Sequence, residues 1–202
     1  MGFTIDHCGI VILAAGKSSR LGSPKQLLSY KGRSLVQHAA DAAISSGIGK
    51  VIVVTGARAD LVGNELENYQ VDLLYNENWE EGMASSISCG VKYFEEMKPE
   101  VDGILFMVCD QPYVSSEILK ELILKQKETG MPISACKYDG VIGTPALYHK
   151  SIFPELKTLQ GDTGARKIIN QHADSVTTIS FLSGKTDIDT ADDYKNLLKT
   201  TN

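Results

Sequence analysis

The sequence predicts an α/β fold: a single domain spanning residues 1–202, with a doubly wound, mostly parallel sheet flanked by helices. Two features indicate this architecture. Short apolar runs without polar alternation recur along the chain, as expected for strands that helices cover on both faces. Segments with helical spacing of apolar residues separate these runs, and strands that alternate with helices form parallel sheets. The 202 residues are enough for one domain with a buried core.

The strands are expected at five places. The apolar runs IVILAA, VIVVTG, VDLLYN and ILFMVCD predict strands over residues 10–15, 51–56, 71–76 and 104–110, and VTTISF predicts a later strand over 176–181. In a doubly wound sheet, ligands bind beyond the carboxyl ends of the strands. The ends of the first and fourth of these strands are therefore the places where a functional site is expected.

Helices are expected between the strands. Ser34 and Gln37 form a capping box ahead of a run with helical apolar spacing, and Gly47 is suited to end that helix. Further helices are expected over residues 84–97, from 118 to about 130, around residues 166–169 and over 190–199.

Charge and composition exclude several classes of protein. The formal net charge is -5, whereas proteins that bind nucleic acid or a membrane surface are usually basic. No run of 18 apolar residues predicts a membrane span, and the first residues show no secretory signal. The four cysteines form no C-x-x-C pair, so reduced thiols and a cytoplasmic location are expected. The expected partners are small molecules, with no nucleic acid and no membrane.

The loop after the first strand has the composition of an anion-binding site. No acidic residue occurs between Lys17 and Ala40, and the basic residues of this span are Lys17, Arg20, Lys25, Lys31 and Arg33. Gly16 and Gly22 allow sharp turns, and the backbone N–H groups of such turns form a nest for anions. The composition fits a triphosphate, and a solvated basic loop is the alternative.

Two common nucleotide-binding motifs do not describe this loop. The P-loop pattern G-x-x-x-x-G-K-[ST] requires a glycine where the chain has Val11. The dinucleotide fingerprint G-x-G-x-x-G fails as well, because Gly16 and Gly22 have five residues between them and no third glycine in register. If the loop binds a nucleotide, it does so in another way.

Acidic residues suited to a metal ion occur at two places. Asp110 directly follows the fourth apolar run, and Mg²⁺ takes one or two carboxylates together with substrate phosphates. A turn aspartate is the alternative for Asp110. The segment DIDTADD near the C-terminus contributes Asp187 and Asp189, for which the first turn of a charged helix is the alternative.

Several blocks of the sequence, in order, resemble the MobA-like nucleotidyltransferases. LAAGKSSRLGSPKQLL, followed by DQP about 85 residues later, is similar to the class as a whole. NENWEEGMASSISCG, GTPALY, LQGDTGAR and DIDTADDY look like later blocks of the molybdenum cofactor cytidylyltransferase group. Together the blocks span almost the whole chain. The resemblance implies a Rossmann-like fold of the kind found in nucleotide-diphospho-sugar transferases.

The resemblance also implies roles for individual residues. The implied catalytic residues are Arg20, Lys25 and Asp110, and the implied metal ligands for Mg²⁺ are Asp110 and Asp189, with Asp187 as the alternative. The implied nucleotide-binding residues are Leu13, Ala14, Ala15, Gly16, Lys17, Gly82, Ser85 and Ser86. The LAAG form is associated with CTP, whereas relatives that use GTP tend to read LAGG. Leu21 departs conservatively from the methionine of many relatives.

The implied reaction moves a nucleoside monophosphate from an NTP, with CTP as the first candidate, to a phosphorylated acceptor and releases pyrophosphate. Molybdopterin cofactor is the first candidate acceptor. An ionised acceptor phosphate needs no general base, which agrees with a sequence that offers no Ser-His-Asp or Cys-His set. The segments 143–145 and 161–164 are expected to shape the acceptor side, although Asp162 could equally cap the helix after it.

Two alternatives to this reaction remain open at the level of the sequence. The same chemistry could serve a polyol or sugar phosphate, because acceptor loops vary most. The chain could instead be a non-catalytic nucleotide-binding maturation factor with a molybdoenzyme or another maturation protein as its partner. The combination of Arg20, Lys25 and Asp110 argues against a pure binding module.

Overall fold

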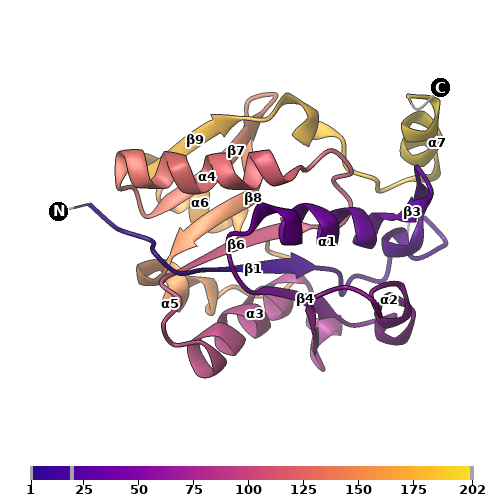
Figure 1. Ribbon diagram of the computed structural model, residues 1–202, viewed down its shortest axis with the longest axis horizontal. Helices are drawn as coiled ribbons and strands as arrows, with labels where there is room; N and C mark the ends of the chain where they lie inside the picture. The colour runs from indigo at the N-terminus through magenta and orange to yellow at the C-terminus, as the bar shows by residue number, and fades with distance from the viewer. Residues whose placement is uncertain (1, 19–20, 201–202) are drawn as a thin grey trace.

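The computed structural model describes residues 2–18 and 21–200, and a seven-stranded sheet forms its centre (Figure 1). The strands lie in the order β5-β4-β1-β6-β8-β7-β9. Their bounds are β1 (Cys8–Leu13), β4 (Val51–Thr55), β5 (Asp72–Tyr75), β6 (Gly103–Val108), β7 (Ile133–Tyr138), β8 (Val141–His149) and β9 (Val176–Ser180). A small separate hairpin consists of β2 (Ser29–Tyr30) and β3 (Arg33–Ser34).

The prediction of a mostly parallel sheet is confirmed. Strand β1 lies at the centre, parallel to both β4 and β6, and β5 and β9 also pair in parallel with their neighbours. Strand β8 alone runs antiparallel to both of its neighbours, β6 and β7. All five predicted strands are present, with ends shifted by at most two residues.

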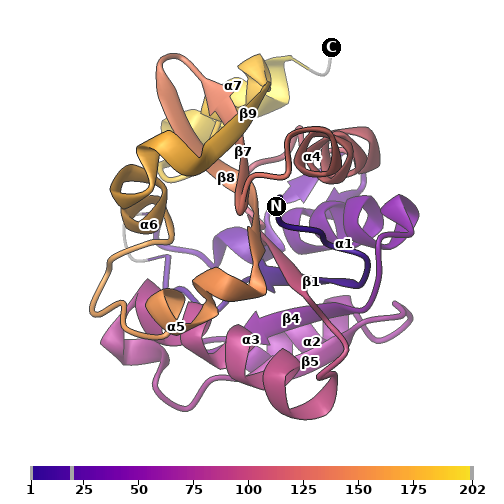
Figure 2. The same ribbon diagram turned by 90° about the vertical axis from the view of Figure 1, so that its left-hand side faces the viewer.

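Helices cover both faces of the sheet, as Figure 2 shows for α1 and α4 on one side and α3, α5 and α6 on the other. Their bounds are α1 (Leu35–Ser46), α2 (Ala59–Glu65), α3 (Met83–Met97), α4 (Ser116–Thr129), α5 (Phe153–Leu156), α6 (Arg166–Gln171) and α7 (Ala191–Lys199). Side chains of β1 alternate between the two layers: Ile10 and Ile12 pack with α1 and α4, whereas Val11 packs with α3. Within residues 2–18 and 21–200, no helix is both long and apolar enough to cross a membrane.

Helix α1 begins and ends where the sequence predicts. The Ser34 side chain accepts a hydrogen bond from the Gln37 backbone N–H, and the Gln37 side chain accepts one from the Ser34 N–H. Gly47 ends the helix in the left-handed conformation, with φ 63°. Local sequence is therefore sufficient to set both ends of α1.

Strand β5 differs from the expectation that helices cover both faces of the run VDLLYN. It is the edge strand of the sheet, and its Leu73 and Tyr75 side chains are about half exposed, at 47% and 54%. The run contains Leu73 and Leu74 side by side, so the pattern alone does not show which of them faces solvent. Edge strands keep one unpaired side, which an apolar run does not reveal.

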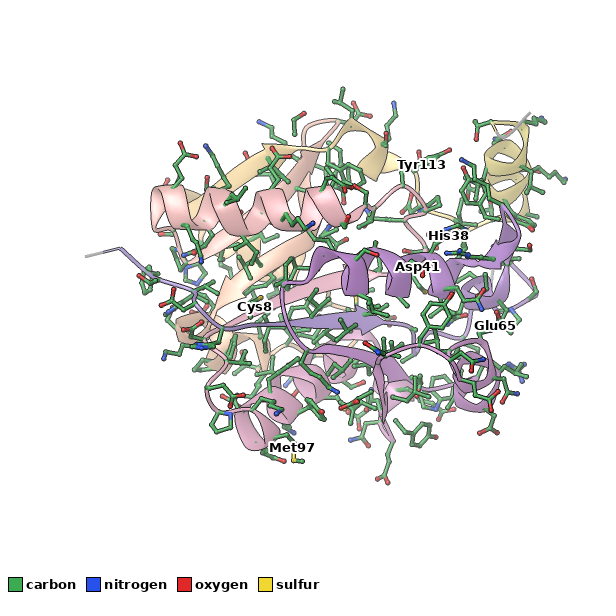
Figure 3. The ribbon with its side chains drawn as sticks, in the orientation of Figure 1. Cys8, His38, Asp41, Glu65, Met97 and Tyr113 are labelled. Atoms are coloured by element: carbon green, nitrogen blue, oxygen red, sulfur yellow. The ribbon has the colours of Figure 1, made fainter. Side chains whose placement is uncertain are left out.

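A third, smaller core cluster holds the C-terminal segment in place. It contains the buried side chains of Tyr30, Leu35, Ile188 and Leu197. At this end of the molecule, where the labels of His38 and Tyr113 lie in Figure 3, the His38 imidazole is hydrogen-bonded to the Tyr30 carbonyl at 2.6 Å. Helix α7 packs against the β2–β3 hairpin through this cluster, and its Tyr194 hydroxyl donates a hydrogen bond to the Ser29 carbonyl.

Candidate active site

A cavity of about 350 Å³ lies at the carboxyl ends of β1 and β6. Nine of its lining residues were predicted from the sequence as nucleotide-binding or catalytic residues: Leu13, Ala14, Ala15, Gly16, Lys17, Lys25, Gly82, Ser86 and Asp110. The fold therefore brings together two segments that the sequence separates, the basic loop and the start of α3. The position agrees with the rule that ligands bind beyond the carboxyl ends of strands.

Three further predicted residues lie elsewhere or cannot be placed. Arg20 lies outside the described residues. Ser85 does not line this cavity but a separate hollow of about 650 Å³, together with residues such as Asn78 and Gly161. Asp189 does not line the cavity either, but it reaches Lys25 at the cavity wall.

Lys25 connects the two carboxylates predicted as a metal site. Its ammonium group forms an ion pair with Asp110 and donates a hydrogen bond to Asp189 Oδ1 at 3.1 Å. The three side chains are largely buried, with 20% of Lys25, 13% of Asp110 and 32% of Asp189 exposed. Two carboxylates thus face one point, and the Lys25 ammonium lies there.

The backbone around Ile188 explains how Asp189 reaches this point. The Ile188 N–H donates to the Asp110 carbonyl at 3.0 Å, while the Ile188 side chain is fully buried in the third core cluster. On the far side of that cluster the Tyr194 hydroxyl donates to the Ser29 carbonyl at 2.7 Å. Helix α7 therefore positions Asp189 relative to both Asp110 and the segment that carries Lys25.

Asp187, the alternative metal ligand, occupies a different place. It lines a neighbouring hollow together with Tyr113 and residues of α7, and it has no hydrogen bond or ion pair to Lys25. Burial raises the pKa of the Asp187 carboxyl, and the charges of Asp110 and Asp189 raise it further. The geometry around Lys25 therefore favours Asp189 as the partner of Asp110.

The Lys25 ammonium stays charged in this environment. Burial by itself lowers the pKa of Lys25, but the charge of Asp110 and the hydrogen bonds to Asp110 and Asp189 outweigh burial and raise that pKa above its ordinary value. Next to it, burial and the neighbouring Asp110 raise the pKa of the Cys109 thiol to about 12. Cys109 is therefore a neutral thiol at physiological pH and a poor nucleophile.

Gln26, which the sequence did not single out, holds the basic loop in shape. Its side chain is 1% exposed, and its amide Nε2 donates to the carbonyls of Ala14 at 2.9 Å and Gly16 at 2.8 Å. The Ser18 hydroxyl in turn accepts a hydrogen bond from the Lys25 N–H at 3.0 Å. These hydrogen bonds fix the backbone of residues 14–18 at the wall of the cavity, which Ser18 and Gln26 also line.

Gly82, at the N-terminus of α3, allows a close contact between two backbone segments. Its φ is 98°, and a Cβ at this position would lie 2.5 Å from the Gly161 carbonyl carbon and 2.7 Å from the Asp162 nitrogen. The Ala84 N–H donates to the Gly161 carbonyl at 3.1 Å. The loop 161–164 therefore supports the start of α3.

Replacing Gly82 with alanine is expected to lower the free energy of unfolding by about 1–3 kcal/mol or more, because only glycine adopts this conformation without strain and the neighbouring backbone has to move. Gly140→Ala is the matched control: Gly140 also has a positive φ, 75°, but open space around it. Urea unfolding of both variants measures the difference. Equal losses in the two variants would show that the close contact contributes nothing.

Asp162 and Trp79 complete the cavity wall. The N-cap of α6 is Ala165, so Asp162 does not cap that helix. It lies on the cavity wall, and its assignment to the acceptor side stays a prediction. Trp79 packs against the second face of the core and close to Gly56, where an added Cβ would lie 2.6 Å from the Trp79 Cβ. Trp79 therefore both packs against the core and lines the cavity.

The carboxylate pair is suited to a hard divalent cation. No group of three or more His, Cys, Asp or Glu side chains that could hold a metal occurs in the described part of the chain. Mg²⁺ and similar ions are often held by only one or two carboxylates, with substrate phosphates and waters as the other ligands. Asp110 and Asp189 already share one cation, the Lys25 ammonium, so the residues present fit such an ion.

Fold and site together define an α/β protein with a nucleotide-type cavity at the carboxyl edge of its sheet. The sequence profile of the MobA-like NTP transferase domain matches residues 10–176, so the chain belongs to this family. The resemblance found in the motif blocks is thereby confirmed at the level of the family.

Two curated relatives match nearly the full length. Nicotine blue oxidoreductase from Paenarthrobacter nicotinovorans is 32% identical over 201 residues, which cover 93% of this chain and 95% of the relative. Purine catabolism protein PucB from Bacillus subtilis is 30% identical, with 91% and 92% covered.

The solved structures give the same picture. The Mycobacterium tuberculosis protein Rv0371c is 31% identical, with a TM-score of 0.83 and with 98% of this chain and 100% of that chain covered. A second structure of that protein, in complex with manganese, matches with 27% identity and a TM-score of 0.79, with 96% and 99% covered. A relative of this fold therefore binds a divalent metal ion.

Proposed function

We propose that the protein is a metal-dependent cytidylyltransferase that transfers CMP from CTP to a phosphorylated acceptor, most specifically molybdopterin cofactor, and releases pyrophosphate. The observation that carries this proposal is the contact of Lys25 with both Asp110 and Asp189 beside the cavity of the basic loop. A lysine and two carboxylates at such a cavity serve a reaction in which negative charge moves between phosphate groups.

The site supplies the groups that nucleotidyl transfer needs. An oxygen of the acceptor phosphate attacks the α-phosphorus of CTP, a new P–O bond forms, and the bond from the α-phosphorus to the bridging oxygen of pyrophosphate breaks. The acceptor oxygen is already ionised, so no side chain has to remove a proton. The protein has to place the two anions and to stabilise the charge that develops on the leaving pyrophosphate.

Lys25 and the basic loop would bind the triphosphate in this proposal. Ala14, Ala15, Gly16 and Lys17 line the cavity, and a Cβ at Gly16 would meet no atom within 4 Å, so a phosphate has room to approach the backbone there. Arg20 belongs to the same loop and is assigned to the triphosphate by the motif resemblance alone.

Asp110 and Asp189 would hold the metal ion, with Mg²⁺ as the proposed physiological cofactor. When bound, such an ion polarises phosphate oxygens and neutralises charge on the pyrophosphate. The Lys25 ammonium contacts the same two carboxylates that would hold the ion. With a cation held there instead, Lys25 would be able to contact the triphosphate. Lys25 would therefore neutralise the two carboxylates in the free protein and the triphosphate in the complex.

The acceptor is assigned from the motif blocks. The names of the two curated relatives, an oxidoreductase and a purine catabolism protein, differ from each other and do not name an acceptor. The blocks GTPALY and LQGDTGAR resemble those of the molybdenum cofactor cytidylyltransferases and support molybdopterin over a polyol or sugar phosphate. The cytoplasm, where CTP and reduced thiols occur together, is the compartment proposed for this activity.

The test is transfer to purified molybdopterin cofactor in the presence of Mg²⁺, with pyrophosphate release and dinucleotide formation measured for CTP and GTP separately. We expect transfer from CTP to exceed transfer from GTP by about tenfold or more, the difference produced by roughly 1.4 kcal/mol. Faster transfer from GTP would contradict the nucleotide assignment. Transfer to a pentitol phosphate or sugar phosphate, without transfer to molybdopterin, would contradict the acceptor assignment.

A further inference from the structure

A buried amide behind the cavity wall holds two neighbouring hydroxyl groups. Asn76 follows β5 and is 4% exposed. Its Nδ2 donates one hydrogen bond to Ser85 Oγ at 2.8 Å and another to Ser86 Oγ at 3.0 Å, and its Oδ1 accepts one from the Asn78 N–H at 3.0 Å. All hydrogens of the Asn76 amide are therefore directed at the first turn of α3.

The two serines differ in what their own hydrogens do. The Ser85 hydroxyl lies within 2.8 Å of the carbonyls of Asn78 and Gly82, so its hydrogen is used inside the loop. The Ser86 hydroxyl accepts from Asn76 and donates to no acceptor among residues 2–18 and 21–200. Ser86 is 4% exposed, and it lines the cavity that contains Lys25. A nearly buried O–H without an acceptor therefore borders this cavity.

We propose that Asn76 and Ser86 together select the nucleotide base: Asn76 is a positioning residue that makes the Ser86 hydroxyl a hydrogen-bond donor toward an acceptor atom of a pyrimidine such as cytosine. This inference rests on the proposed function, because that function assigns the Lys25 end of the cavity to the triphosphate. The wall formed by Gly82, Met83 and Ser86 is then left for the nucleoside.

The chemistry of the bases fits a donor at this position. Cytosine carries two adjacent acceptors, O2 and N3, on its pairing edge, whereas guanine carries two adjacent donor groups, N1–H and N2–H₂, beside its O6. A fixed donor therefore favours cytosine over guanine. The Asn76 amide occupies one lone pair of Ser86 Oγ and offers the Ser86 hydrogen no acceptor, so this hydrogen is available to donate into the cavity.

Asn76→Asp reverses this arrangement with almost no change in shape. The carboxylate offers no hydrogen, so the Ser86 O–H turns to donate to it, and the oxygen of Ser86 presents lone pairs to the cavity instead. The variant should therefore weaken CTP binding and favour a base that presents N–H groups. Ser86→Ala removes the donor without reversing it.

The experiment is calorimetric titration with Mn²⁺ and three probes: CTP, GTP and inorganic tripolyphosphate, which shares only the phosphates. Asn76→Asp and Ser86→Ala are each expected to lower CTP affinity about tenfold, the scale of a buried acceptor that loses its donor. Both should lower the ratio of CTP to GTP affinity and leave tripolyphosphate binding within about twofold. In the double variant, Asn76→Asp should add nothing to the CTP loss of Ser86→Ala, because both act through one hydroxyl.

Ser88→Ala is the matched control, because Ser88 lies on the same helix, α3, but does not line this cavity. It should leave the CTP to GTP ratio unchanged. If Ser86→Ala lowered the affinities for CTP and GTP equally, the hydroxyl would contact the ribose and not the base, and the inference would be overturned. Additive losses of CTP affinity in the double variant would overturn it as well.

The same data separate this inference from the proposed function. A wild-type protein that binds no nucleotide with Mn²⁺ would overturn both. A wild-type protein that binds CTP, with ratios that do not respond to Asn76 or Ser86, would overturn the base-selecting role alone. A wild-type preference for GTP would overturn the cytidylyl assignment, and the response of the ratio to Asn76→Asp would still decide the role of Ser86.

Discussion

Replacing Lys25 with methionine is expected to lower the rate of nucleotidyl transfer by at least about a hundredfold, the scale seen when one preorganised charge donor is lost from an active site. Methionine keeps most of the length of the side chain and removes its charge. The change should appear in steady-state pyrophosphate release at saturating CTP. Lys31→Met is the matched control: Lys31 belongs to the same basic span but lies over the Tyr30 ring, 5.2 Å from its centroid, away from the cavity.

The Lys25 variant should also be less stable than the wild type. The sequence of the basic loop does not predict this loss, because an exposed loop cation contributes little stability. Lys25 is not an exposed loop cation, and without it Asp110 and Asp189 would face each other as like charges. We expect a loss of about 1–3 kcal/mol in the free energy of unfolding, the range for a buried polar group that loses its partner. Mn²⁺ should restore much of it by replacing the ammonium. A turnover number equal to that of the wild type would contradict the catalytic role of Lys25 and would favour the alternative, a solvated basic loop.

Asp110→Asn is expected to have the largest effect of any single change, a loss of about a thousandfold in transfer rate. The reason is that Asp110 is proposed as a metal ligand, and a bound metal ion supplies several kcal/mol of charge stabilisation in the transition state. Metal titrations of the rate, with Mg²⁺ and Mn²⁺ in turn, should show a raised metal requirement in this variant.

A comparison of Asp189→Asn with Asp187→Asn shows which aspartate is the second metal ligand beside Asp110. Both residues belong to the same short segment, but only Asp189 is hydrogen-bonded to Lys25. Asp189→Asn should therefore lower the rate by about tenfold or more and raise the metal requirement, whereas Asp187→Asn should change the metal requirement little. The opposite result would move the second ligand to Asp187, and no effect from either would leave a site with one carboxylate.

The central half of the fold could be predicted because its strands are buried on both faces. The runs that became β1, β4 and β6 are continuous apolar segments, and the ends of α1 follow from a capping box and a glycine. Strands β7 and β8 were not predicted. Gly143 and Pro145 interrupt the apolar pattern of β8, and a proline in a strand argues against a central position, yet β8 lies between β6 and β7.

The site could be predicted only in part, because some of its residues are far apart along the chain. Lys25 and Asp189 are 164 positions apart, and no local pattern indicates that they meet. The family resemblance implied only that Asp110 and Asp189 hold one metal ion, and the contact of Lys25 with Asp189 was not predicted. Gln26 and Asn76 were missed because a buried amide looks like any polar residue in a sequence. Asn76 did carry a signal: it directly follows an apolar run, as Asp110 does.

The central claim is that the α-phosphorus of the nucleotide is attacked, and two labels on CTP test it directly. With molybdopterin cofactor, Mg²⁺ and CTP labelled at the α-phosphate, the label should appear in the acceptor product in a one-to-one ratio with released pyrophosphate, and label at the γ-phosphate should appear only in pyrophosphate. Label from the γ-phosphate in the acceptor would show phosphoryl transfer instead. Absence of both labels from the product, with CTP bound, would support the non-catalytic maturation factor and contradict the proposed enzyme.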